Sequence, residues 1–307
     1  IRINGGTAMM RILGIVGVQV CICVPIIVFQ FCKGKEFFSK EYWGYALRIG
    51  IPIVPHYLSG IILNQGDRIM IDKMVGKTEV ALYGLAYSIG MLVQLFISGM
   101  NSALTPWMYS KIKKGDIRSM RKVLQLLSIV VVGIAVALML ISPEMVLIFG
   151  SPKYREAVYV IPPVAASVFF IFIYNILSMP QFYYEKTQFL MAASMAAAGA
   201  NVVLNFIFIR LFGYIAAGYT TLACYMLYSV GHYIVSKQIL VNEGIQENLM
   251  NPGFLLACSV FLIGASIICN LIFPYRILRY AILLASAGLV FWKKELLLKT
   301  MADIRKK

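Results

Sequence analysis

The chain has 307 residues, of which 60% are hydrophobic and 13% charged, and its mean hydropathy is +0.81. No water-soluble domain of this length could bury so much apolar surface. The formal charge of +15 is not accompanied by a soluble nucleic-acid-binding module, so nucleic acid is not an expected partner. The composition predicts an all-α polytopic membrane protein, because lipid-facing segments must satisfy their own backbone hydrogen bonds.

Apolar runs long enough to cross a hydrocarbon core of roughly 30 Å recur along the chain. They predict about nine transmembrane helices, over residues 10–32, 42–64, 80–104, 122–142, 157–180, 188–212, 214–236, 254–273 and 276–292. The connecting loops are short, so we expect neither enzyme activity nor a cofactor. The chain begins with Ile1, and we expect it to be part of a longer protein. Its cysteines lie in or beside apolar runs without metal-ligand spacing, which predicts buried thiols and no metal site.

Basic residues in short loops set the predicted orientation, because loops rich in Lys and Arg stay in the cytoplasm. Against the single acid Asp116, one loop carries Lys111, Lys113, Lys114, Arg118, Arg121 and Lys122. Placing it inside puts the connection at 33–43 and the basic tail at 293–307 inside as well, so the C-terminus is expected in the cytoplasm. The residues that then fall outside, against the rule, are Arg2, Arg11, Arg276 and Arg279. Most of the positive charge is expected to meet anionic lipid headgroups.

Polar residues inside the spans mark the candidate site, because they normally face a cavity or a partner helix. On a helix through 42–73, about a quarter of the circumference holds Arg48, Pro52, Pro55, His56, Ser59 and Gly66, with Asp67 at the margin. Arg48 could face a cavity or snorkel to the headgroups, and both readings stay open. His56 could contact a ligand or bond a neighbouring helix.

The next helix carries a longer polar stripe at spacings of three and four. Its members are Tyr83, Tyr87, Gly90, Gln94, Ser98, Asn101 and Thr105. A stripe of this length favours a wet lumen, although polar side chains in membranes also join helices. A third stripe consists of Thr221, Tyr225, Tyr228 and His232, and Asn201 pairs with Asn205 on the helix before it.

Two further readings concern Asp67 and the prolines. Neighbouring residues on a helix do not face each other, so Arg68 is expected to pair with Asp72 at i+4. We favour a structural end-cap role for Asp67 and keep ion coupling as the alternative. Pro52 and Pro55 each remove a helical hydrogen bond, so they could form a hinge, although static kinks are commoner.

Three motifs in order resemble the bacterial polysaccharide (O-antigen and capsule) flippases of the multidrug/oligosaccharidyl-lipid/polysaccharide exporter superfamily. The first is an Asp, a Gly, a Tyr-rich span and a Pro before a basic loop, through Asp67, Gly76, Tyr83, Ala86, Tyr87 and Pro106. The second is a Gly-x-x-x-Tyr-x-x-Ala run through Gly150, Tyr154 and Ala157. The third is a hairpin through Asn201, Asn205, Phe212, Gly213, Ala216 and Ala217. The resemblance covers about residues 41–240.

The resemblance implies two six-helix lobes around a central cavity that alternate in access, in the bacterial cytoplasmic (inner) membrane. Residues 1–40 would hold the last helix of the first lobe and the inter-lobe loop. Residues 41–240 would form the second six-helix lobe, and 241–307 two additional helices and a basic tail.

The implied function is flipping an undecaprenyl-diphosphate-linked oligosaccharide repeat unit to the outer leaflet, with polysaccharide polymerase and chain-length machinery as further partners. The task requires cations for phosphate and aromatic rings for sugars. The expected substrate-binding residues are Arg48, His56, Ser59, Tyr83, Tyr87, Gln94, Asn101, Tyr225 and Tyr228. The alternatives are a multidrug cation antiporter, which the scarcity of acids in the stripes disfavours, and a lipid II-type flippase.

Overall fold

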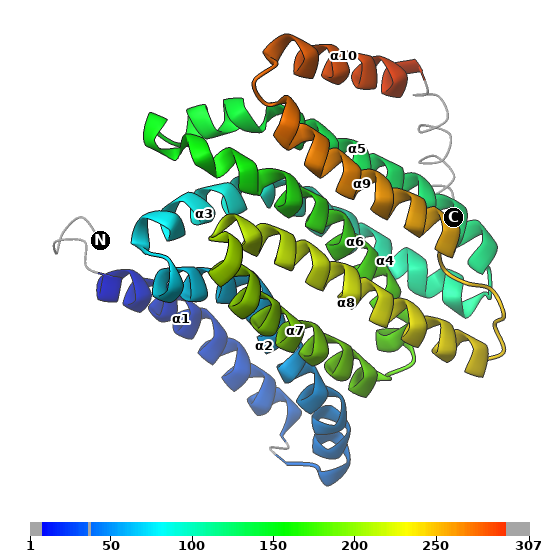
Figure 1. Cartoon of the computed structure of the whole chain (residues 1–307). Coiled ribbons are helices and arrows are strands. Elements are labelled where there is room, and N and C mark those ends of the chain that lie inside the picture. The colour runs from blue at the N-terminus through cyan, green and yellow to red at the C-terminus, as the bar shows by residue number, and fades with distance from the viewer. Residues whose placement is uncertain (1–7, 36–37, 293–307) are drawn as a thin grey trace. The chain divides into compact units, whose positions relative to one another are not determined.

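The computed structural model describes residues 8–35 and 38–292, and within these ranges the regular structure is helical (Figure 1). In chain order the elements are α1 (Ala8–Gly34), α2 (Lys40–Met74), α3 (Lys77–Gly90), α4 (Leu92–Lys113), α5 (Ile117–Phe149), the 3₁₀ helix η1 (Pro152–Val160), α6 (Ile161–Tyr183), α7 (Thr187–Phe212), α8 (Ile215–Asn242), α9 (Pro252–Ile272) and α10 (Arg276–Trp292). Arg2 and the basic tail at 293–307 lie outside the described residues. The predicted all-α membrane fold is confirmed.

All nine predicted spans coincide with helical segments, and two of them consist of two pieces. The span predicted at 80–104 is α3 followed by α4, and the span at 157–180 is η1 followed by α6. By length and composition, seven helical segments of the described chain can cross a membrane. Helix α8 is long enough, but its tyrosines, threonines and His232 lower its hydropathy, and α10 has only 17 residues.

The chain divides into two compact units, residues 1–50 and 51–307, and the division falls inside α2. The first unit holds α1 and the start of α2. Within it the apolar side chains of α1 are exposed, including Cys21, Cys23 and Cys32, so the prediction of buried thiols is wrong for these three cysteines. An apolar helix with so much exposed side-chain surface can meet lipid or another part of the protein. Cys224 and Cys269, in the second unit, are buried as predicted.

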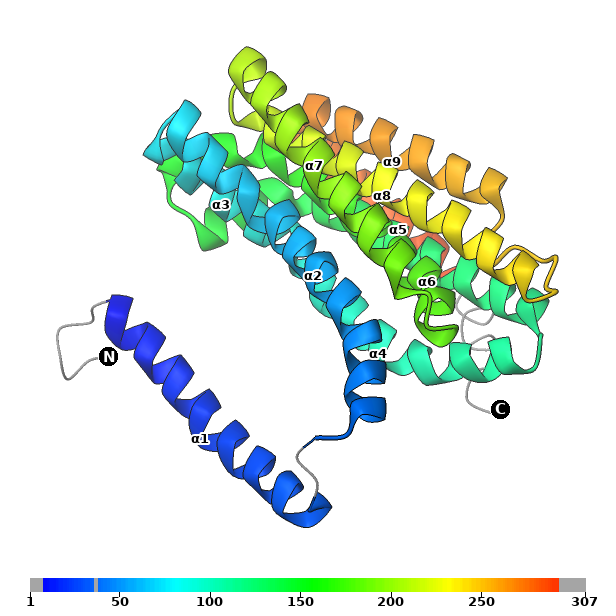
Figure 2. The same ribbon diagram turned by 90° about the horizontal axis from the view of Figure 1, so that it is seen from below.

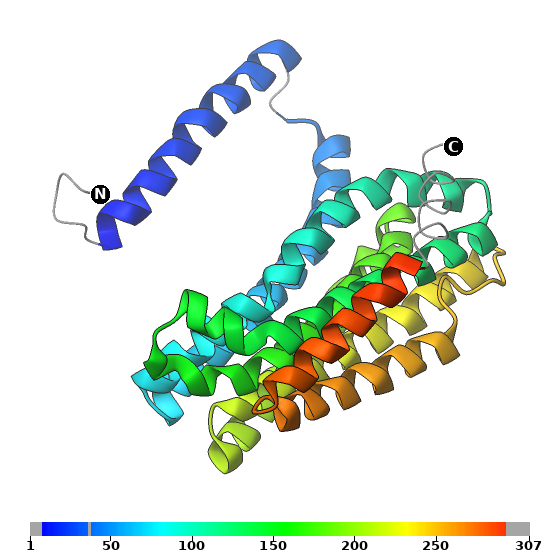
Figure 3. The same ribbon diagram turned by 90° about the horizontal axis from the view of Figure 1, so that it is seen from above.

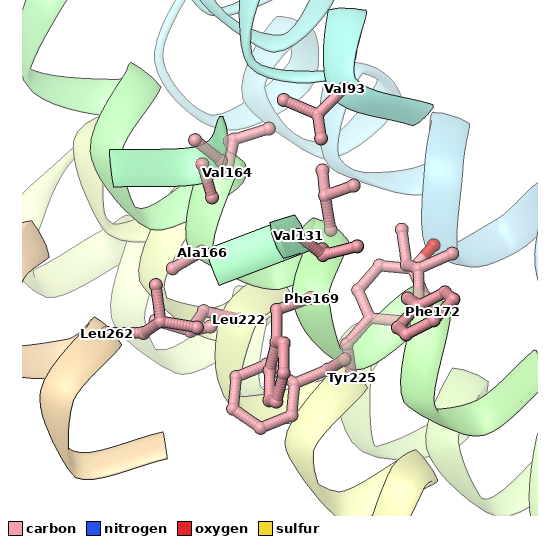
Figure 4. Close-up of a cluster of buried hydrophobic side chains, with 14 of the residues drawn as sticks. Val93, Val131, Val164, Ala166, Phe169, Phe172, Leu222, Tyr225 and Leu262 are labelled. Atoms are coloured by element: carbon pink, nitrogen blue, oxygen red, sulfur yellow. The ribbon is translucent and has the colours of Figure 1, made fainter. Parts of the chain in front are cut away.

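The core of the second unit is built around α6, which is buried along nearly its whole length. It packs most extensively against α8 and α5, with α3, α4 and α9 completing its surroundings. Phe169 and Phe172 of α6 lie among Val131 of α5, Leu222 of α8 and Leu262 of α9 (Figure 4). A helix that is apolar all round is expected in such a central position.

Local sequence signals explain where several helices begin and end. Asp116 caps α5, because its carboxylate accepts a hydrogen bond from the Ser119 amide at 3.3 Å. Asn251 caps α9 in the same way, accepting from the Gly253 amide at 2.8 Å, with Pro252 at the first helical position. Between α7 and α8, Gly213 has φ 74°, a conformation that favours glycine.

The break between α3 and α4 falls at Met91, directly after a close helix contact. A Cβ atom on Gly90 would lie 2.6 Å from a methyl group of Val164, so only glycine allows α3 to approach α6 this closely. The helical hydrogen-bond ladder is interrupted at Met91 and resumes in α4. The polar stripe predicted as continuous over 83–105 is therefore divided between two helices.

Helix α10 is fastened to α5 by a charged pair. The Arg279 guanidinium donates two hydrogen bonds of 2.8 Å to the two carboxylate oxygens of Glu144 and a third, of 2.6 Å, to the Leu140 carbonyl. The Tyr280 hydroxyl also donates to Glu144, at 2.9 Å. Figure 3 shows α10 running along α5, with α9 also beside it. Such two-pronged pairs are among the strongest polar contacts in proteins.

Candidate functional site

The second unit contains a cavity of about 690 Å³ between α2, α3, α6 and α8. Its lining residues are His56, Tyr57, Gly60, Ile61, Leu63, Asn64, Gln65, Tyr87, Ser88, Met91, Tyr174, Asn175, Ser178, Phe182, Tyr225 and Tyr228. Aromatic rings and carboxamides dominate this set. Figure 2 shows α2 beside α3 and α7 on this side of the unit. The cavity has the size and the mixed lining of a small-molecule site.

Asn64 of α2 is the polar centre of this lining. Its carboxamide oxygen accepts hydrogen bonds from the hydroxyls of Tyr87 at 2.6 Å and Tyr225 at 3.3 Å. Its amide nitrogen donates to the Gly60 carbonyl, one turn back along α2, at 2.7 Å. One side chain therefore links α2 to both α3 and α8 at the cavity wall.

The rest of the wall is a set of stacked rings. Tyr174 of α6 lies 4.5 Å from the ring centre of Tyr228 and stacks on Tyr225 at 6.3 Å with 9° between the planes. The Tyr228 hydroxyl shares a hydrogen bond of 3.0 Å with His56 Nδ1. The rings of Phe182 and His56 form an edge-type pair, with 6.4 Å between their centres and 75° between their planes. Rings held on several sides have few rotamers, so the wall is preorganised.

A second polar cluster, which we call the Asp67 cluster, consists of Asp67, Tyr83, Asn205, Thr220 and Thr221. Asp67 is completely buried, and its carboxylate accepts from Asn205 Nδ2 at 2.5 Å, from the Thr221 hydroxyl at 2.6 Å and from the Tyr83 hydroxyl. Thr220 donates to the Asn205 carboxamide oxygen. These bonds join α2 to α3, α7 and α8 with neutral donors only.

Two predictions about this part of α2 are wrong. Asp67 does not cap the helix end, because α2 continues to Met74 and the carboxylate points at neighbouring helices. Arg68 does not pair with Asp72 within the described part of the chain. Its guanidinium lies over the Tyr87 ring, 5.5 Å from the centre, and its Nε is buried without a hydrogen-bond partner there. The ring face offers Arg68 a cation–π contact instead.

Four of the predicted substrate-binding residues come together in the cavity lining: His56, Tyr87, Tyr225 and Tyr228. Two others are not in that lining. The Ser59 hydroxyl is buried and donates to the Pro55 carbonyl of its own helix at 2.7 Å, which is a common way for serine to satisfy itself in a helix. Tyr83 is completely buried in the Asp67 cluster.

The remaining predicted residues lie elsewhere. Gln94 and Asn101 are on α4, beyond the break at Met91, and are not among the lining residues; each has a buried carboxamide oxygen without a partner among the described residues. Arg48 is exposed in the first unit. Pro52 and Pro55 lie inside α2, which continues through both.

The structure adds lining residues that the sequence stripes did not include, namely Tyr57, Asn64, Gln65, Tyr174, Asn175 and Phe182. A signal for two of them was present: Tyr174 and Asn175 interrupt the apolar run of α6, the most buried helix. Asn64 lies three residues before Asp67, on the same side of α2. As an uncharged side chain it gives a weaker sequence signal than Asp67 does.

Part of the chain that lines the cavity is similar to known proteins. Residues 6–113, about a third of the chain, match the model of a family described as polysaccharide biosynthesis protein. Over residues 41–113, where it overlaps this match, the predicted family resemblance is confirmed at the level of polysaccharide biosynthesis. The match to this polysaccharide biosynthesis family includes the first motif, from Asp67 to Pro106, and the α2 and α3 residues of the cavity. The motifs at Gly150 and Asn201 lie beyond it.

Two curated relatives come from Haemophilus influenzae. "Lsg locus putative protein 1" is 28% identical over 172 residues, which is 52% of this chain and 41% of the relative. An "Uncharacterized membrane protein" is 29% identical over 191 residues, or 58% of this chain and 46% of the relative. The chain therefore spans less than half the length of these relatives. No solved structure matches it.

Proposed function

We propose that this chain is part of a flippase that carries an undecaprenyl-diphosphate-linked oligosaccharide repeat unit across the bacterial cytoplasmic membrane by alternating access. The observation that carries the proposal is the cavity of about 690 Å³, lined by rings and carboxamides, in a chain whose described part has seven helical segments long and apolar enough to span a membrane. Sugars crossing hydrocarbon need such a polar surface. No covalent bond changes in this task.

The family match supports the polysaccharide role at a coarser level, because the family description names polysaccharide biosynthesis. In the proposal His56, Tyr87, Tyr225 and Tyr228 contact the oligosaccharide. Arg48 contacts the diphosphate, for which a planar guanidinium is well suited. Membrane lipids, a polysaccharide polymerase and chain-length machinery are the proposed partners, with the C-terminus in the cytoplasm.

Arg48 gives the first test of the phosphate contact. In the full-length protein, Arg48→Ala or Arg48→Gln should lower the rate of transbilayer movement of a lipid-linked oligosaccharide in proteoliposomes, because the diphosphate loses its cation. Arg118→Gln, in the first turn of α5, is the matched control and should transport normally. Membrane insertion should be unchanged in all three variants. Full transport by the Arg48 variants would assign Arg48 to the headgroups instead.

The rival function is a multidrug cation antiporter of the same superfamily. An organic cation would favour a carboxylate in the wall, and the described lining residues include none, while Asp67 behind them is completely buried and bonded. The two functions separate in a strain deleted for the gene: loss of surface polysaccharide with unchanged drug susceptibility supports the flippase, and the reverse supports the antiporter. A lipid II-type flippase is the nearer alternative, and deletion would then impair growth of the cell wall.

We further propose that Asp67 is the ion-coupling residue. It is a buried carboxylate that accepts hydrogen bonds from neutral donors on three helices. A proton or a monovalent cation at this position would therefore change the hydrogen bonds that join α2 to α3, α7 and α8. Transport by the full-length protein should then depend on a proton or sodium gradient, and Asp67→Asn should abolish the dependence. Transport that is indifferent to both gradients would remove this role.

A further inference from the structure

Tyr174 and Asn175 of α6 are two polar residues in a helix that is otherwise packed into the core. Both line the cavity, while most of α6 around them is buried among apolar side chains. Tyr174 is stacked on Tyr225 and touches Tyr228, so its ring is fixed from the α8 side. Neither residue lies on the polar stripes that the sequence suggested. A fixed ring at a cavity wall is a stacking platform.

The polar groups of this part of the wall are available to a ligand. The Tyr174 hydroxyl makes no hydrogen bond to another described residue. Asn175 donates its amide to the Ile171 carbonyl at 2.9 Å, which leaves its carboxamide oxygen to accept. Gln65, across the cavity on α2, is exposed and hydrogen-bonded to none of the described side chains. Hydroxyls and carboxamides are the neutral groups that match the hydroxyls of a sugar ring.

The same wall is poor in charge. Its sixteen lining residues include no Asp, Glu, Lys or Arg. Asp67 lies behind it, completely buried, and Arg68 is held over the Tyr87 ring. A carboxylate on a sugar would therefore lose water here without gaining a cation, which is costly. An uncharged sugar ring loses only the water bound to its hydroxyls, and hydrogen bonds to the carboxamides replace that water.

We propose that Tyr174, Asn175 and Gln65 form a subsite for an uncharged pyranose ring, with the apolar C–H face of the sugar on Tyr174 and its hydroxyls on the two carboxamides. The inference rests on the proposed function, because it names which part of the lipid-linked substrate this wall receives. The diphosphate is bound elsewhere in the full protein. The electron-rich ring face attracts the weakly positive C–H groups of the sugar.

The test uses the full-length protein and two oligosaccharides that differ in one sugar, a neutral hexose or its uronic acid. Each is measured free, by calorimetric binding to the purified protein, and on the same polyprenyl diphosphate, by transport in proteoliposomes. The wild-type protein should bind the neutral form at least about fivefold more tightly. Tyr174→Leu should weaken its binding about tenfold, whereas Tyr174→Phe, which keeps the ring, should stay within about threefold.

Two further variants complete the design. Tyr275→Leu, at an exposed tyrosine before α10, is the matched control and should bind both sugars as the wild type does. Asn175→Lys should shift the binding preference toward the uronic acid. A poorly folded variant would lose binding, so it could not produce this gain of affinity. The proposal is overturned if the wild type binds the uronic acid as tightly as the neutral sugar, or if Tyr174→Leu binds normally. Selective binding without transport would refute the flippase function and leave the sugar subsite standing.

Discussion

The cavity wall around Asn64 and the Asp67 cluster share three helices and lie one turn apart along them, yet they differ in burial and in access to the cavity. Helices α2, α3 and α8 each contribute one residue to the wall and another, three or four positions away, to the cluster. The corresponding pairs are Asn64 and Asp67, Tyr87 and Tyr83, and Tyr225 and Thr221. The wall leaves polar groups open to a cavity, whereas the cluster lies wholly in the interior.

We therefore expect the two regions to have different roles: the wall binds the substrate, and the Asp67 cluster stabilises the packing of the helices. In the Asp67 cluster a single carboxylate serves donors from three helices, so the free energy of that junction depends on one residue. At the wall, Asn64 accepts from two hydroxyls, and one of these bonds is long. Changes in the cluster should therefore act on stability and on every substrate, and changes in the wall should act on affinity for the oligosaccharide.

The largest effect is expected from Asp67→Ala. This change leaves the Tyr83 and Thr221 hydroxyls buried without the acceptor they share and leaves Asn205 Nδ2 with only its bond to Asn201, at a cost on the order of 3 kcal/mol in the free energy of unfolding. Thermal unfolding of the full-length protein in detergent measures the loss. Ser128→Ala is the control, because that buried hydroxyl bonds only the backbone of its own helix, at the Leu124 carbonyl. An unchanged melting temperature for Asp67→Ala would contradict the fastening role.

A smaller effect of another kind is expected from Asn64→Ala. It removes the acceptor shared by Tyr87 and Tyr225 but leaves both hydroxyls beside the cavity, where water can reach them. Binding of the oligosaccharide should weaken about tenfold while the melting temperature falls by only a few degrees. Calorimetry and thermal unfolding of one preparation separate the two quantities. If Asn64→Ala lowered stability as much as Asp67→Ala does, the wall would stabilise the fold as the cluster does, contrary to the expected difference in roles.

The smallest effect is expected from Tyr225→Phe. The change deletes the 3.3 Å bond to Asn64 and keeps the ring that stacks on Tyr174. We expect affinity to change about twofold to threefold, because a long hydrogen bond contributes little. Tyr87→Phe, which deletes the 2.6 Å bond, should cost more in the same assay. The reverse order would show that Asn64 depends on α8 more than on α3.

The helices were readable from the sequence because the membrane imposes a length and a polarity on each span. What was not readable is how α3 meets α6, since the fit of Gly90 against Val164 depends on three-dimensional packing. That fit comes just before the break at Met91, and the predicted stripe beyond it, at Gln94 and Asn101, does not reach the cavity. Helical periodicity holds only as far as the helix is continuous.

About half of the candidate site could be predicted from the sequence, and the reason is related. His56, Tyr87, Tyr225 and Tyr228 lie on stripes within single helices, and a projection of one helix finds them. Asp67 needs partners on α3, α7 and α8, and no single-helix pattern joins residues that are 138 or 154 positions apart. Tyr174 stands in an almost wholly apolar helix, where no stripe exists to reveal it.

The charged pair of Glu144 and Arg279 also has a consequence for how the chain inserts into the membrane. With the predicted orientation the start of α10 lies on the outer side, where the positive-inside rule disfavours arginine. Helix α5 is synthesised first, so the carboxylate is already in place when α10 follows, and the two can be accommodated as a neutral pair. In that orientation we expect the acid to act as a topogenic signal for a helix that comes more than a hundred residues later. In a Glu144→Gln chain, glycosylation mapping should find the α9–α10 hairpin inverted in part of the population.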